Sequence, residues 1–140
     1  RTIDEYNEKY YQEIYDCINL YTDYSVLGHL DMIQRYNETI YPFEKSAKII
    51  EKILRKVIND GKGIEVNTSS FRYGLEDLMP SRKILSLYHE LGGEIITIGS
   101  DCHNADDFGD KIPLIKNELM KIGFSKICTF KDMKPIYHAL

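Results

Sequence analysis

The sequence predicts an α/β domain built from parallel strand-helix units. Segments with helical spacing of apolar residues alternate with short apolar, β-branched runs, and this alternation repeats four times along 140 residues. The helical segments between the strands are roughly a dozen residues or longer, the length that a crossover between parallel strands requires. We therefore expect a single domain, residues 1–140, whose strands end at one common rim.

Helical periodicity accounts for four segments. The first follows Thr2, whose spacing to Glu5 is that of a capping box, and extends to Tyr21. The side of this helix that we expect to be buried carries Ile3, Tyr6, Tyr10, Ile14, Cys17 and Tyr21. The other helices are expected at residues 43–58, 80–91 and 112–122, each followed closely by glycine, with a short helical turn at 105–110.

Short runs rich in apolar and β-branched residues predict the strands. They are expected within residues 25–29, 64–67, 94–103 and 126–130, and the third runs into a polar tip. The last residues, 135–140, are expected to form an extended tail. Because each strand follows a helix, the order favours parallel pairing throughout.

Polar side chains stand at the ends of the first three strands. His29 ends the first strand, Glu65 and Asn67 lie on one side of the second, and Asp101 and His103 end the third. Carboxylate and imidazole groups are common ligands of divalent metal ions. Taken singly, Asp101 has the alternative role of a helix cap and His103 that of a surface histidine. Their position with His29 and Asn67 at one rim favours a metal site.

Composition narrows the classes of partner. The formal net charge is −4, and 18 basic residues are interspersed with 22 acidic ones, so no basic stripe for nucleic acid is present. No apolar run has the length of a membrane span, and residues 1–5 carry no signal-peptide pattern. The three cysteines form no C-x-x-C pair, which argues against a disulfide framework and against a structural zinc site. We expect a cytoplasmic protein that binds neither nucleic acid nor membranes.

Three motifs in this order resemble the PHP family, and most closely its histidinol-phosphate phosphatases. They are Gly-His-Leu-Asp at 28–31, Glu-Val-Asn-Thr-Ser at 65–69 and Ile-Gly-Ser-Asp-Cys-His at 98–103, and the resemblance spans residues 25–109. It implies part of a distorted seven-stranded, TIM-like β/α barrel, roughly its last four strand-helix units. It also implies two or three divalent metal ions, commonly zinc, manganese or iron, and hydrolysis of a small phosphate monoester such as histidinol phosphate, a step of histidine biosynthesis.

The resemblance also assigns roles to residues within the three motifs and just after the first two. It implies that His29, Asp101 and His103 are metal ligands, and Asp101 is the candidate that also handles a proton. It implies that Arg35 and Arg72 bind phosphate, a role that suits the planar donor fork of guanidinium. Glu65 and Asn67 are expected to hold ligands or substrate in place. The alternatives are solvated surface arginines and a hydrogen-bonded barrel interior for Glu65 and Asn67.

One family feature is absent from these 140 residues. The family builds its first metal position with H-x-H on an early strand, whereas this sequence has histidine only at 29, 89, 103 and 138. We therefore expect the chain to be the C-terminal part of a longer protein and to bind metal weakly and hydrolyse little by itself. We also expect exposed barrel edges to favour homo-oligomers or strand exchange. The alternatives are a PHP-type phosphoesterase for another small phosphorylated substrate, and a non-catalytic binding or assembly domain.

Overall fold

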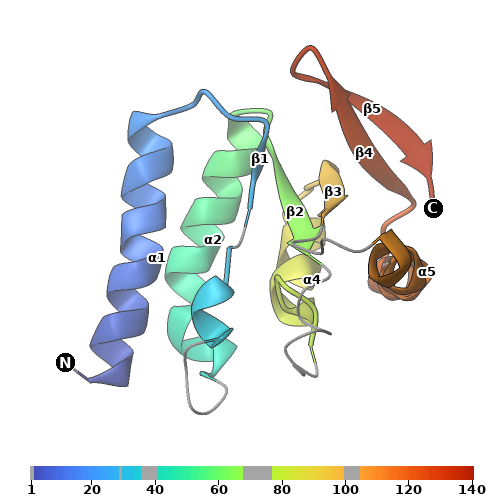
Figure 1. Cartoon of the computed structure of the whole chain (residues 1–140). Coiled ribbons are helices and arrows are strands. Elements are labelled where there is room, and N and C mark those ends of the chain that lie inside the picture. Colours follow the sequence, from blue (N-terminus) through green and yellow to red (C-terminus); the bar gives the residue numbers. More distant parts are fainter. Residues whose placement is uncertain (1, 29, 36–40, 68–76, 100–104) are drawn as a thin grey trace.

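The structure, a computed structural model, describes residues 2–28, 30–35, 41–67, 77–99 and 105–140 (Figure 1). A three-stranded parallel sheet in the order β1-β2-β3 forms its centre. The elements in chain order are α1 Ile3–Leu20, β1 Val26–Leu27, the 3-10 helix η1 Met32–Arg35, α2 Phe43–Asn59, β2 Gly63–Asn67, α4 Arg82–Glu90, β3 Ile96–Gly99, α5 Ala105–Ile122, β4 Lys126–Lys131 and β5 Lys134–Ala139.

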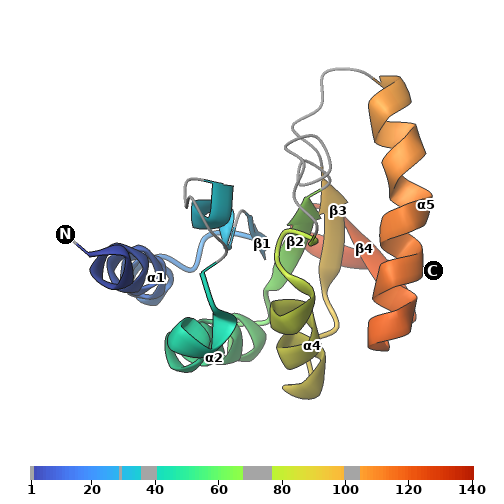
Figure 2. The same cartoon turned by 90° about the horizontal axis from the view of Figure 1, so that it is seen from below.

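Helices α2 and α4 cover one face of the sheet, with α1 packed beyond α2 (Figure 2). The strand alternation of β2 explains this packing. Ile64 and Val66 are fully buried in the core with apolar residues of both helices, whereas Glu65 is half-buried and shares its side of the strand with Asn67. The members of the core that are fully shielded from solvent include Ile53, Leu54, Val57, Leu85, Tyr88, Ile96, Ile115 and Leu119. The predicted α/β class with a parallel sheet is confirmed.

The helix ends carry local caps, of which Thr2 and the glycine after α2 were predicted from the sequence and the Ser81 cap was not. The Thr2 hydroxyl accepts a hydrogen bond from the Glu5 backbone N–H at 3.2 Å, and Ser81 does the same for Ile84 at 3.3 Å. Beyond α2, Gly61 adopts a φ of 69°, a left-handed conformation that glycine reaches without a Cβ clash. These local signals explain why the helix bounds lie close to those expected from the sequence.

The buried side of α1 was predicted only in part, since Tyr10 and Ile14 are partly buried against the core but the fully buried residues are others. The residues that α1 buries are Asn7, Tyr11 and Ile18, whereas Ile3 and Tyr6 are 46% and 54% exposed. A search for helical spacing of apolar residues does not include Asn7, because asparagine is polar. Its side-chain amide donates a hydrogen bond to the Ile3 carbonyl at 2.8 Å, so this buried face accommodates a polar residue. The helix thus carries two candidate stripes, and packing against α2 selects the one centred on Tyr11.

The C-terminal region also differs from the prediction. The strand at 126–130 does not join the parallel sheet by a ladder; β4 pairs antiparallel with β5, formed by the residues expected to be a tail. Asp132 and Met133 connect the two strands with φ values of 53° and 63°, the backbone of a tight hairpin turn. Asp-Met is a weak sequence signal for that turn, because neither residue is a glycine.

The fourth predicted helix is longer than expected. Helix α5 runs without interruption from Ala105 to Ile122 and contains Pro113. The prediction divided this segment because apolar periodicity begins only at Ile112. In the part of the chain that the structure describes, no helix is long and apolar enough to cross a membrane.

The corrected face of α1 can be tested by two matched substitutions. Replacing Ile18, which is 3% exposed, by alanine removes buried apolar contacts and should lower the free energy of unfolding by about 2–5 kcal/mol. The same change at Ile3, on the side expected from the sequence, should alter it by about 0.5 kcal/mol or less. Urea unfolding of both variants measures the difference. Equal losses would contradict the observed packing.

Candidate functional site

The carboxyl ends of the three parallel strands form a common rim. Strand β1 pairs with β2 through Leu27 and Ile64, and β2 pairs with β3 up to Asn67 and Gly99. Each of these strands ends in the same direction (Figure 1). The segments that follow the strands therefore leave from neighbouring positions, as the sequence predicted.

Several predicted site residues lie outside the described part of the chain. These are the three predicted metal ligands and one of the two arginines: His29, Asp101, His103 and Arg72. Arg35 is the last residue of η1, which follows β1 at the rim. The structure thus brings their flanking strands together and leaves the ligand set itself a prediction.

Glu65 and Asn67 lie together, as predicted from their spacing. The Asn67 side-chain amide donates a hydrogen bond to Glu65 Oε1 at 3.2 Å. Asn67 is 1% exposed, and its backbone N–H donates to the Met79 carbonyl at 2.7 Å. Asn67 is therefore fixed at both its backbone and its side chain, and it orients the carboxylate of Glu65.

Gly99 makes room for the Glu65 carboxylate, and Gly28 lies beside it. A Cβ atom on Gly99 of β3 would lie 2.5 Å from Glu65 Oε2, and one on Gly28 would lie 3.7 Å from Oε1. The carboxylate thus lies between the ends of β1 and β3. Gly28 directly precedes His29, and Gly99 stands two positions before Asp101. A carboxylate at this place suits a divalent cation held between the two neighbouring strand ends.

Asp31 is a buried residue of the rim to which the sequence assigned no role. It is 4% exposed, and its Oδ2 accepts a hydrogen bond from the backbone N–H of Ser81 at 2.9 Å. Burial, with the nearby charge of Asp77, raises the pKa of Asp31 to about 7, and the Ser81 hydrogen bond opposes this rise. The only sequence signal for it was its place in Gly-His-Leu-Asp. It ties the segment after β1 to the start of α4.

A second set of polar contacts holds the start of α4. Asp77 Oδ1 accepts hydrogen bonds from the backbone N–H of Leu78 at 2.7 Å and of Arg82 at 2.9 Å. The Arg82 guanidinium also binds Asp77 at 3.1 Å and Glu118 of α5 at 2.9 Å, which lowers the pKa of Glu118. These contacts join α4 to α5 next to the rim.

Among the residues that the structure describes, no three His, Cys, Asp or Glu side chains gather in a way that could hold a metal ion. Two histidines outside the rim have other surroundings. The ring of His89, which is exposed, meets the Phe124 ring edge-on, with the ring centroids 4.9 Å apart. His138 lies in β5, 2.9 Å from the Thr129 hydroxyl. Neither residue adds to the candidate site.

No family model matches the chain. Curated relatives match it over most of its length. A probable histidinol-phosphatase of Thermotoga maritima is 35% identical over 102 residues, which are 72% of this chain and 42% of that protein. A histidinol-phosphatase of Lactococcus lactis is 28% identical over 134 residues, 94% of this chain and 49% of that protein. The chain spans about half the length of these relatives or less.

A solved structure is similar over nearly the whole chain. It is a crystal structure of histidinol phosphate phosphatase from Lactococcus lactis, complexed with zinc, L-histidinol and phosphate. The match has a TM-score of 0.81 and 26% identity, and it covers 97% of this chain and 52% of the other. The likeness therefore extends beyond the three motifs to α1 and to the C-terminal hairpin.

The contact between Gly99 and Glu65 can be tested by a double-mutant cycle. Gly99→Ala should lower the free energy of unfolding by about 1–3 kcal/mol, because the new Cβ atom displaces the carboxylate. In a Glu65→Ala background the same change should have a clearly smaller effect. A Glu94→Ala background, which removes an exposed carboxylate elsewhere, should leave the full effect in place. Equal effects in all three backgrounds would show that Glu65 does not lie over Gly99.

Proposed function

Because this chain is a relative of the PHP-family histidinol-phosphatases in sequence and in fold, we propose that it forms part of a metal-dependent phosphate-monoester hydrolase, most directly a histidinol-phosphatase. The observation that carries this proposal is the match of 97% of the chain to a structure that holds zinc, L-histidinol and phosphate. The rim arrangement of Glu65 between Gly28 and Gly99 supports it independently.

We further propose that the chain is one domain and part of a distorted seven-stranded β/α barrel. The three parallel strands, with helices α2 and α4 on one side, are the repeating unit that such a barrel requires. The single continuous core supports one domain, since it contains residues of α1, α2, α4 and α5. The match to 52% of the solved phosphatase agrees with a partial barrel. Hairpin β4-β5 lies outside the parallel ladder in this proposal.

The proposed metal site uses His29, Asp101 and His103, with the Glu65 carboxylate facing the same rim. The donor set of imidazole and carboxylate groups fits zinc, manganese or iron. The chemistry that divalent metal ions supply when bound there is neutralisation of phosphate charge and activation of water. Asn67 contributes by fixing the orientation of Glu65 through its side-chain amide.

The remaining proposed roles concern the phosphate and the proton. Arg35 and Arg72 hold the non-bridging phosphate oxygens, because a guanidinium group offers paired hydrogen-bond donors and a permanent positive charge. Its attraction to the phosphate oxygens strengthens as negative charge develops on them in the transition state. An Asp101 carboxylate oxygen accepts the proton that the attacking water loses. A cytoplasmic location fits a biosynthetic phosphatase and stays a proposal.

Asp101 provides the most direct test of the proposed chemistry. In the natural protein that contains this chain, Asp101→Asn should lower turnover of histidinol phosphate at saturating metal at least about a hundredfold, because both a ligand and a proton acceptor are lost. Asp132→Asn, in the hairpin turn where asparagine tolerates the positive φ, is the matched control and should keep normal turnover.

Two results would count against the proposal. Near-normal turnover of the Asp101→Asn variant would remove the role of Asp101. In a panel of phosphate monoesters, turnover of another ester well above that of histidinol phosphate would agree with the proposed metal site but show that the substrate is a different one.

A further inference from the structure

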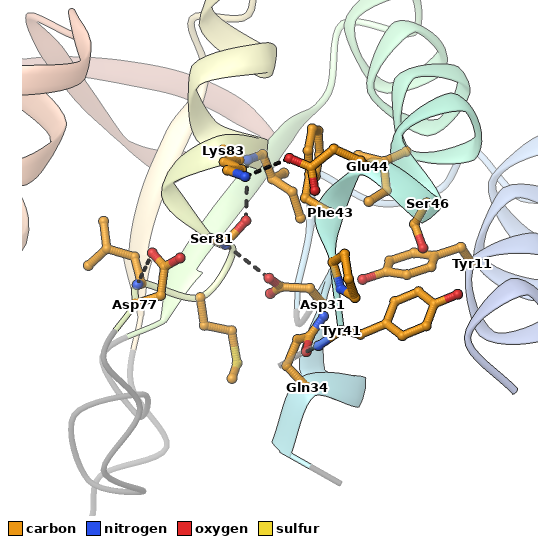
Figure 3. A pocket seen from close by; sticks show the side chains of 15 residues that line it. Tyr11, Asp31, Gln34, Tyr41, Phe43, Glu44, Ser46, Asp77, Ser81 and Lys83 are labelled. Atoms are coloured by element: carbon orange, nitrogen blue, oxygen red, sulfur yellow. Dashed lines mark hydrogen bonds and ion pairs between the residues drawn. The ribbon is translucent and has the colours of Figure 1, made fainter. Parts of the chain in front are cut away.

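A cavity of about 430 Å³ lies among helices and connecting segments, and its described lining includes no residue of a strand. Its walls come from α1, from η1, from the start of α2 and from the segment that leads into α4 (Figure 3). The volume is in the range of pockets that hold small molecules. Glu65 and Asn67 are not among its described lining residues, so in the described part of the chain the cavity shares Asp31 with the rim but not the Glu65–Asn67 pair.

Aromatic and aliphatic side chains form most of the cavity wall. The aromatic rings are those of Tyr11, Tyr41 and Phe43, and the aliphatic side chains include Leu78 and Met79. Tyr11 is 1% exposed and Met79 is 1% exposed, so these walls are set in the packed core. Such a lining suits the apolar body of a ligand.

The charged residues of the described lining are paired, with one exception. Lys83 binds Glu44 at 2.6 Å, and Asp77 binds Arg82 at 3.1 Å. Asp31 has no such partner. Its Oδ2 accepts the Ser81 backbone N–H, and its Oδ1 is a buried oxygen with no hydrogen-bond partner in the described structure. A buried acceptor of this kind is unfavourable until a donor reaches it.

We propose that this cavity is a second binding site and that it takes a small organic amine with an apolar body. The ammonium group donates a hydrogen bond to Asp31 Oδ1, the buried oxygen that has no other donor in the described structure. The apolar body packs against Tyr11, Tyr41 and Phe43, whose ring faces also attract a cation. The other charged residues of the described lining are paired, so Asp31 is the acidic group left to interact with a ligand. The site therefore selects amines over neutral or anionic molecules of the same shape.

The binding of two isosteric probes tests this site on the whole chain. Phenethylamine carries the ammonium group, and 2-phenylethanol replaces it by a neutral hydroxyl. NMR titrations without added metal, which keep rim binding out of the measurement, give the dissociation constant of each probe. Phenethylamine should bind the wild type with amide shifts clustered around residues 31, 46 and 81–84 and more tightly than 2-phenylethanol.

Two variants and one control distinguish the contribution of the Asp31 carboxylate from that of the open cavity volume. Asp31→Asn should weaken phenethylamine binding roughly tenfold or more, as expected for loss of a charged hydrogen bond, and leave 2-phenylethanol unchanged. Ser46→Leu fills the cavity from α2 while keeping the Asp31 carboxylate and should abolish binding of both probes. Glu51→Gln, an exposed carboxylate of α2 outside the lining, should behave as the wild type.

Three outcomes would overturn the proposal. They are no binding of phenethylamine to the wild type, shifts that map away from the cavity, and equal affinity in the wild type and Asp31→Asn. If Asp31→Asn does not fold, Ser46→Leu decides, because phenethylamine binding that survives a filled cavity excludes this site. The measurement involves no phosphate hydrolysis, so it stands or fails separately from the proposed phosphatase function.

Discussion

The alternation of side chains along β2 is the constraint on which the rest of the structure depends. Ile64 and Val66 enter the core with α2 and α4, and this places Glu65 and Asn67 together on the other side of the strand. A shift of one residue in the pairing with β1 or β3 would exchange the two sides. The same pairing sets Gly99 of β3 beside the Glu65 carboxylate. The pairing register of β2 with its two neighbours therefore determines both the packing of the core and the position of the candidate site.

Contacts of Asp31 and of the start of α4 connect the sheet to the surrounding helices. The hydrogen bond from Ser81 to Asp31 joins segments 50 residues apart in the chain. The Arg82 contacts with Asp77 and Glu118 then extend this connection to α5. Asp31, which follows β1, and the segment that leads into α4 are thus held by buried or half-buried polar contacts. Because Asp31 also borders the cavity, a ligand there contacts the segment that directly follows His29.

Local signals in the sequence were enough for most elements, and tertiary packing decided the rest. Thr2, Ser81 and Gly61 carry their own capping chemistry, so helix ends could be predicted without knowing the neighbours. The buried side of α1 could not, because the choice between its two stripes depends on α2. The β4-β5 hairpin was missed because its turn lacks glycine. Asp31 stands in the Gly-His-Leu-Asp motif, yet its burial and its hydrogen bond from Ser81 arise from a tertiary contact that no local pattern encodes.

The central claim is that the rim formed by β1, β2 and β3 carries a metal-phosphate site. Anomalous diffraction at the zinc edge, from crystals of the natural protein soaked with zinc and inorganic phosphate, tests it most directly. We predict zinc peaks at the rim with Asp101 and His103 at coordination distances of about 2.0–2.2 Å, and phosphate density beside Arg72. Zinc found only elsewhere, such as at His89 or His138, with no phosphate at the strand ends, would contradict the claim.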